Sequence, residues 1–60
     1  QYVRPEGDLK LIYYQDGSDL AVAVVKATLA GDELYLVSLR KASQRELTVA
    51  KRSGKAKPWH

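Results

Sequence analysis

The sequence predicts a small α+β domain, in which a three-stranded antiparallel β-meander is followed by a short C-terminal helix. Three observations carry this prediction: β-forming runs alternate with short turns over residues 9–39, the hydrophobic period changes after residue 42, and the chain has only 60 residues. A chain of this length buries about 60% of its unfolded surface, so it supports one small core. The chain is therefore expected to be a single small domain or a fragment of a larger one.

The first strand of the meander is expected at Leu9–Tyr14, a run that is rich in β-forming side chains. It is followed by the dipeptide Asp16-Gly17, which is typical of a hairpin turn because glycine adopts a positive φ without a steric penalty. Residues 1–8 precede this strand, contain both proline and glycine, and show no clean hydrophobic period. We expect them to form a lead-in loop.

The second strand is expected at Leu20–Leu29, in the middle of the meander. Both of its alternating sets of side chains are apolar, which is typical of a strand that is covered on both faces. Its alanines also permit a helix, but its valines and flanking turns favour a strand. A turn at Ala30–Glu33 then leads to the third strand at Leu34–Leu39, and such short connections predict antiparallel pairing.

A helix is expected over residues 43–53, where the hydrophobic period changes. The segment Ser-Gln-Arg-Glu that begins at Ser43 fits a capping box, in which the serine hydroxyl accepts a hydrogen bond from an early helical N–H. Gly54 is placed to end the helix in the left-handed conformation. A fourth strand over Glu46–Lys51 is the alternative interpretation. Residues 54–60 are expected to form a loose basic tail.

The two signs of charge are segregated along the chain, which has a formal net charge of +3. Residues 1–39 contain three basic and six acidic side chains, whereas residues 40–60 contain seven basic side chains and one acidic side chain. This asymmetry indicates a basic surface that is able to meet phosphate groups. The alternative is a solvated basic tail that keeps the protein soluble and binds nothing.

Several classes of site are excluded by composition. The chain has no cysteine, which excludes disulfides and thiolate metal sites. Its single histidine, His60, cannot supply the ligands of a zinc site, so we expect no metal and no cofactor.

The uncharged run Leu20–Val25 is far shorter than the roughly 20 residues of a membrane span. No signal peptide is visible, and a cytoplasmic protein without a membrane partner is expected.

Residues 36–46 form the most specific pattern in the chain, Leu-Val-Ser-Leu-Arg-Lys-Ala-Ser-Gln-Arg-Glu. This pattern resembles the C-terminal signature of BrnT-type toxins in the RelE-like ribonuclease superfamily, in which a strand ends in Ser-x-Arg-Lys/Arg-Ala-Ser/Thr-x-x-Glu and opens the last helix. The hairpin over residues 9–25 is similar as well, and the resemblance extends from residue 9 to about residue 53. The same layout is similar to the barnase/EndoU/colicin/RelE-like nuclease domains of phage head proteins. The matching positions are Ser38, Arg40, Lys41, Ala42, Ser43 and Glu46.

The resemblance implies a metal-independent ribonuclease toxin-like domain that acts on RNA and represents the C-terminal part of a RelE-like fold. It implies a cognate antitoxin, or the remainder of a larger chain, as the protein partner. It also implies a location in the cytoplasm or in a phage particle. The N-terminal helices of such toxins have no counterpart in the chain.

The same residues predict a phosphate site on physical grounds. RNA cleavage through the 2′-hydroxyl needs a base, an acid and a cation that stabilises the phosphorane. Arg40 lies where the third strand meets the helix, so it can contact a phosphate beside the helix N-terminus. Arg40 is therefore the predicted catalytic cation, and Ser38 is a second catalytic candidate that hydrogen-bonds the substrate. The predicted nucleic-acid-binding residues are Lys41, Arg45, Tyr35, Lys51 and Arg52.

Two further functions remain as alternatives. The first is a non-catalytic nucleic-acid-binding β-module, which uses the same cations for phosphates and tyrosines for base stacking. The second is a structural or interaction piece of a phage particle, in which the fold is kept without the chemistry.

Overall fold

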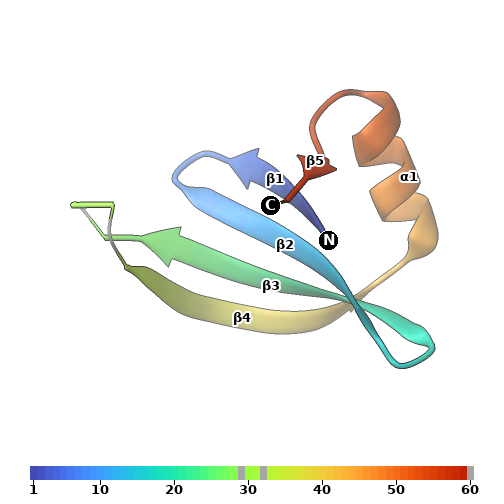
Figure 1. Cartoon of the computed structure of the whole chain (residues 1–60), viewed down its shortest axis with the longest axis horizontal. Coiled ribbons are helices and arrows are strands. Elements are labelled where there is room, and N and C mark those ends of the chain that lie inside the picture. The colour runs from blue at the N-terminus through green and yellow to red at the C-terminus, as the bar shows by residue number, and fades with distance from the viewer. Residues whose placement is uncertain (29, 32, 60) are drawn as a thin grey trace.

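The computed structural model of the chain describes residues 1–28, 30–31 and 33–59. The strands form one antiparallel sheet in the order β4-β3-β2-β1-β5, and a single helix packs against it (Figure 1). The α+β class is confirmed, but the sheet has five strands where the sequence predicted three. In chain order the elements are β1 (Tyr2–Glu6), β2 (Leu9–Asp16), β3 (Asp19–Ala27), β4 (Leu34–Ala42), α1 (Gln44–Arg52) and β5 (Lys57–Pro58).

The predicted meander corresponds to β2, β3 and β4. Strand β3 pairs with β2 on one side and with β4 on the other, as expected for the middle strand of the meander. Gly17 adopts a φ of 62° in the turn between β2 and β3, which confirms the hairpin. Strand β4 continues to Ala42, three residues beyond the predicted end at Leu39. Leu29 and Asp32, which were assigned to the second strand and the second turn, lie outside the described residues.

The prediction of a lead-in loop over residues 1–8 is wrong, because β1 occupies Tyr2–Glu6 and pairs along its length with β2. Pro5 had argued against a strand, since proline cannot donate to a sheet ladder. On the other side of β1, however, β5 pairs only with Tyr2 and Val3. Pro5 therefore lies on an edge, where a missing N–H is tolerated.

The prediction of a loose tail is also wrong for the described residues 54–59. Strand β5 pairs with β1, and the N–H of Trp59 donates to the carbonyl oxygen of Gln1 at 3.0 Å. Ala56 is buried, and its N–H donates to the carbonyl oxygen of Ala50 at 3.0 Å. These contacts bring the two ends of the chain side by side (Figure 1). His60 lies outside the described residues.

The predicted helix is confirmed as α1, so the alternative strand over Glu46–Lys51 is wrong. Ser43 is the N-cap, and its Oγ accepts a hydrogen bond from the N–H of Glu46 at 3.0 Å. Gly54 follows the helix with a φ of 76°, the left-handed conformation that ends it. The glutamate of the capping box does not reach back to the cap, because its carboxylate is engaged elsewhere, as described below.

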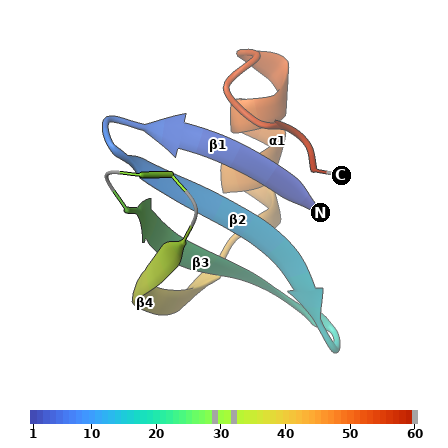
Figure 2. The same cartoon turned by 60° about the vertical axis from the view of Figure 1, so that its left-hand side comes forward.

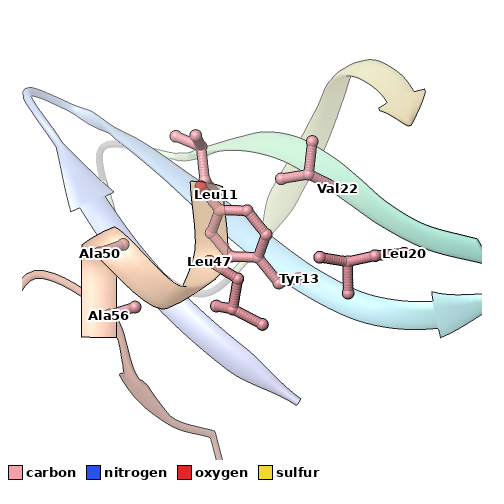
Figure 3. Packing of buried hydrophobic residues seen from close by; sticks show 7 residues of the cluster. All are labelled: Leu11, Tyr13, Leu20, Val22, Leu47, Ala50 and Ala56. Carbon is pink, nitrogen blue, oxygen red and sulfur yellow. The ribbon is translucent and has the colours of Figure 1, made fainter. Parts of the chain in front are cut away.

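The core lies between α1 and one face of the sheet (Figure 2). Tyr13 and Val22 are its most buried side chains, at 1% and 0% exposure. Figure 3 shows the sheet residues of this cluster facing Leu47 of the helix. Within the described residues α1 is the only helix, so a helix covers β3 on one face alone. The sequence pattern had predicted that both faces of this strand would be covered. The core cluster consists of Leu11, Tyr13, Leu20, Val22, Leu47, Ala50 and Ala56.

We call the sheet face opposite α1 the open face. Val22 and Leu20 point into the core, so the alternate residues of β3, such as Ala23 and Val25, belong to the open face. No helix in the described part of the chain is long and apolar enough to cross a membrane.

Candidate functional site

Arg40, the predicted catalytic cation, is paired within the chain. Its Nη1 and Nη2 donate to Glu46 Oε1 at 3.2 Å and to Glu46 Oε2 at 3.1 Å, and Nη1 also donates to the carbonyl oxygen of Lys41 at 3.3 Å. The hydrogen bonds to Glu46 raise the pKa of Arg40 above its ordinary value. The strand-to-helix junction therefore holds a two-point arginine–carboxylate pair, of which the arginine is half exposed.

Tyr13 connects this ion pair to the core. Its ring is buried, and its hydroxyl donates to Glu46 Oε2 at 2.6 Å. Burial, followed by the hydrogen bond to Glu46, raises the pKa of Tyr13 to about 12. The hydrogen bonds from Arg40 and Tyr13 in turn lower the pKa of Glu46 below its ordinary value. Glu46 is thus an ionised carboxylate at neutral pH, and the sequence had assigned it only to the helix cap.

A pocket of about 420 Å³ lies between β1 and α1, and three cationic side chains line it. We call it the cationic pocket. Arg4 comes from β1, Arg45 from the first turn of α1, and Lys55 from the segment that follows the helix. Two serine hydroxyls and a carboxylate complete its polar lining. The lining residues are Arg4, Ser43, Arg45, Glu46, Val49, Ala50, Ser53 and Lys55.

Arg4 is the most constrained cation of the pocket. Its side chain is only 21% exposed, and its Nη2 donates to Glu6 Oε2 at 2.8 Å. Its Nε is buried and has no hydrogen-bond partner among the described residues. A buried donor without an acceptor costs about 1–3 kcal/mol, so the Arg4 guanidinium is held in place at an energetic cost. Sequence reasoning missed Arg4, because it placed this residue in a loop.

The charge balance of the cationic pocket is positive. Glu46 is its only acidic lining residue within the described chain, and that carboxylate is already neutralised by Arg40. Neither Arg45 nor Lys55 forms an ion pair with another described residue. The pocket runs along α1 from Ser43 at its N-terminal end to Ser53 at its C-terminal end, and the helix dipole favours an anion at the first of these ends.

The other predicted nucleic-acid-binding residues are spread over the molecule. Lys41 lies 3.7 Å from Asp19 Oδ2, and its partner in the sheet, Ala21, belongs to the open face. The ammonium of Lys51 stacks over the ring of Tyr2 at 4.4 Å from the ring centroid. Arg52 is exposed in the last turn of α1.

Tyr35 and Ser38 lie on β4, outside the cationic pocket. Ser38 pairs with Val24 and Arg40 pairs with Val22, so these two predicted catalytic residues share the helix-side face of the sheet. Of the predicted site residues, the structure brings Arg45 into the pocket and joins Arg40 to it through Glu46. No signal within any local segment pointed to Arg4, whereas Tyr13 was considered only for base stacking and Lys55 only as part of a loose basic tail.

The described residues contain no group of three or more His, Cys, Asp or Glu side chains that could hold a metal ion. Comparison of the chain with protein-family models, with curated proteins and with solved structures found no match.

Proposed function

We propose that this domain binds the phosphodiester backbone of RNA at the cationic pocket. The observation that carries the proposal is the convergence of Arg4, Arg45 and Lys55 on a pocket whose one carboxylate is already paired with Arg40. Guanidinium groups present paired donors to phosphate oxygens, and Arg4 and Arg45 bring two such groups to the pocket.

The choice of RNA among polyanions rests on the resemblance of residues 36–46 to RelE-like ribonucleases. That segment supplies Ser43, Arg45 and Glu46 to the pocket lining, and two of these, Ser43 and Glu46, stand at matching positions of the pattern. Tyr35 and Ser38 lie on β4, at the other side of the sheet from β1, where an exposed tyrosine can stack on a base. In this proposal the domain is the C-terminal part of a RelE-like fold.

The test is fluorescence anisotropy of a labelled single-stranded RNA at two salt concentrations. We expect Arg45→Ala and Lys55→Ala each to weaken binding by about three- to tenfold and to reduce the salt slope by about one. Lys10→Ala is the matched control, because it removes the same charge from the open face, where Lys10 pairs with Val25. Equal losses in all three variants would show that RNA binding follows net charge and does not use the pocket.

Metal-independent RNA cleavage is a second candidate, and the observation that favours it is Glu46. This carboxylate is ionised at neutral pH and lines the pocket beside three cations. A base of this kind can accept the proton of a 2′-hydroxyl, while the cations stabilise the charge that develops on phosphorus. Attack of the 2′-oxygen on phosphorus then forms a 2′,3′-cyclic phosphate and breaks the bond to the 5′-oxygen, which takes up a proton from water.

Mass spectrometry of RNA that has been incubated with the protein tests for that cyclic end. We expect Glu46→Gln to abolish its formation and to leave RNA binding within about threefold of the wild-type affinity, because the pocket cations remain. RNA that stays intact while it is bound would reject cleavage and leave the binding function in place.

A further inference from the structure

Strand β4 lies at one edge of the sheet and, among the described strands, has β3 as its only neighbour. Along its outer side, alternate N–H and C=O groups therefore point away from the sheet. The strand also exposes large apolar side chains, each between 47% and 60% accessible. A long apolar edge is a template for pairing with another strand. These side chains are Leu34, Tyr35, Leu36, Val37 and Leu39.

The charges around β4 are arranged so that the strand complements a reversed copy of itself. Glu33 precedes the apolar stretch, and Arg40 follows it. The midpoint of residues 33–40 falls between Leu36 and Val37. An identical strand that pairs antiparallel about this midpoint places Glu33 opposite Arg40 and apolar residues opposite apolar residues, including Leu34 opposite Leu39. Tyr35 then lies opposite Ser38.

A regular strand could not use this register, because residues 34 and 39 would point to opposite faces. Strand β4 is irregular: its register shifts between Val24 and Val25 of β3, and Val37 is the additional residue. As a result, Leu34 and Leu39 pair with Ala27 and Ala23, which belong to the same open face.

The same register shift also places two residues of β4 on the helix-side face of the sheet. Tyr35 and Ser38 pair with Lys26 and Val24, so both belong to the helix-side face. The pairs Leu34–Leu39 and Tyr35–Ser38 of the proposed register therefore each meet on one face of a continuous sheet. The bulge makes the two halves of β4 compatible with an identical, reversed strand.

We propose that two copies of this chain pair antiparallel through β4 to form a twofold-symmetric dimer with one continuous ten-stranded sheet. The proposal stands independently of RNA binding. Arg40 keeps its contacts with Glu46, because a guanidinium has five N–H donors and the side chain is half exposed. Glu33 is exposed and forms no ion pair with another described residue, so it is available to Arg40 of the second copy.

Cysteine cross-linking tests the register directly, because the chain has no native cysteine. In the double variant Tyr35→Cys/Ser38→Cys, each introduced thiol lies opposite its counterpart on the other copy. Within one chain the two positions are three residues apart along a strand, about 10 Å, which is too far for a disulfide. We expect mild oxidation to give a covalent dimer.

The single variant Ser38→Cys is the matched control. In the proposed register Ser38 faces Tyr35 of the other copy and not its own equivalent, so cross-linking is expected to stay at background. Efficient cross-linking of this single variant would mean that position 38 of one copy lies opposite position 38 of the other. That result would overturn the proposed register.

Sedimentation equilibrium over a concentration series tests the dimer itself. We expect the wild-type chain to dimerise and Leu36→Lys to raise the dissociation constant by about tenfold or more, since two like charges would meet at the centre of the interface. Val49→Lys is the control, because Val49 lies on α1 and is 57% exposed against 60% for Leu36. A wild-type chain that remains monomeric, or a Leu36→Lys variant that dimerises as the wild type does, would overturn the proposal.

Discussion

At the scale of single residues, Glu46 joins three parts of the protein. Its backbone N–H donates to the capping Ser43 side chain, its carboxylate accepts hydrogen bonds from Arg40, and the same carboxylate accepts a hydrogen bond from the Tyr13 hydroxyl of the core. The side chain is mostly shielded from water, which strengthens both hydrogen bonds. Replacing this carboxylate is therefore expected to affect the stability of the fold.

The lowered pKa of Glu46 predicts a specific pH dependence of stability. The folded state releases this proton more readily than the unfolded state, so ionised Glu46 stabilises the fold above the unfolded value, near 4.5. That stabilisation is lost as the pH falls through the lower folded pKa. We expect Glu46→Gln to cost on the order of 1–2 kcal/mol at neutral pH and almost nothing in strong acid. Chemical denaturation of both proteins across a pH series measures this difference, and a difference that does not change with pH would contradict it.

At the scale of elements, α1 is defined at both ends by local signals. Ser43 satisfies an N–H of the first turn, and Gly54 adopts the left-handed conformation after the last turn. Two buried residues, Leu47 and Ala50, attach the helix to the sheet. A nine-residue helix is too short to be stable alone in water, so its cap and its packing face are both needed.

Loss of the cap is expected to destabilise the protein measurably. Ser43→Ala removes the acceptor for the N–H of Glu46 and should lower the free energy of unfolding by about 1 kcal/mol. Thr48→Ala serves as the control, because Thr48 is exposed in the middle of α1, where alanine is the better helix former. Thermal melting of the two variants should move in opposite directions from the wild type. Equal shifts of the two melting temperatures would argue against a stabilising role of the Ser43 cap.

At the scale of the whole molecule, stability is concentrated in the middle of the sheet. Strands β2 and β3 each have a hydrogen-bonded neighbour on both sides and supply four of the buried core residues. Strand β5 has only two residues, and β4 has one free edge. The sheet therefore has a protected centre and two edges of different character, one short and one long and apolar.

This arrangement predicts the order of amide exchange. We expect the slowest exchange in β2 and β3, because these amides are released only when the sheet itself opens. The outward-facing amides of β4 should exchange faster in dilute protein and should become protected as the dimer forms. Exchange followed by NMR at two protein concentrations measures both effects. Slower exchange in β1 than in β3 would contradict the first expectation.

The sequence by itself determined the features that depend on neighbouring residues. The turn at Gly17, the pairing of β3 between β2 and β4, and the helix with its cap at Ser43 all follow from local conformational preferences and hydrophobic periods. The catalytic and RNA-binding roles that the sequence suggested for Arg40, Ser38 and the surrounding cations stay predictions.

Only the tertiary structure decided which distant residues meet. Strand β1 carries no periodic signal and exists because β2 offers it a paired edge, which places Arg4 beside α1. Tyr13 and Glu46 are 33 positions apart, yet their hydrogen bond lowers the pKa of the carboxylate that lines the cationic pocket. Strand register and helix docking set such contacts, because both depend on the summed burial of the whole core and not on any one segment.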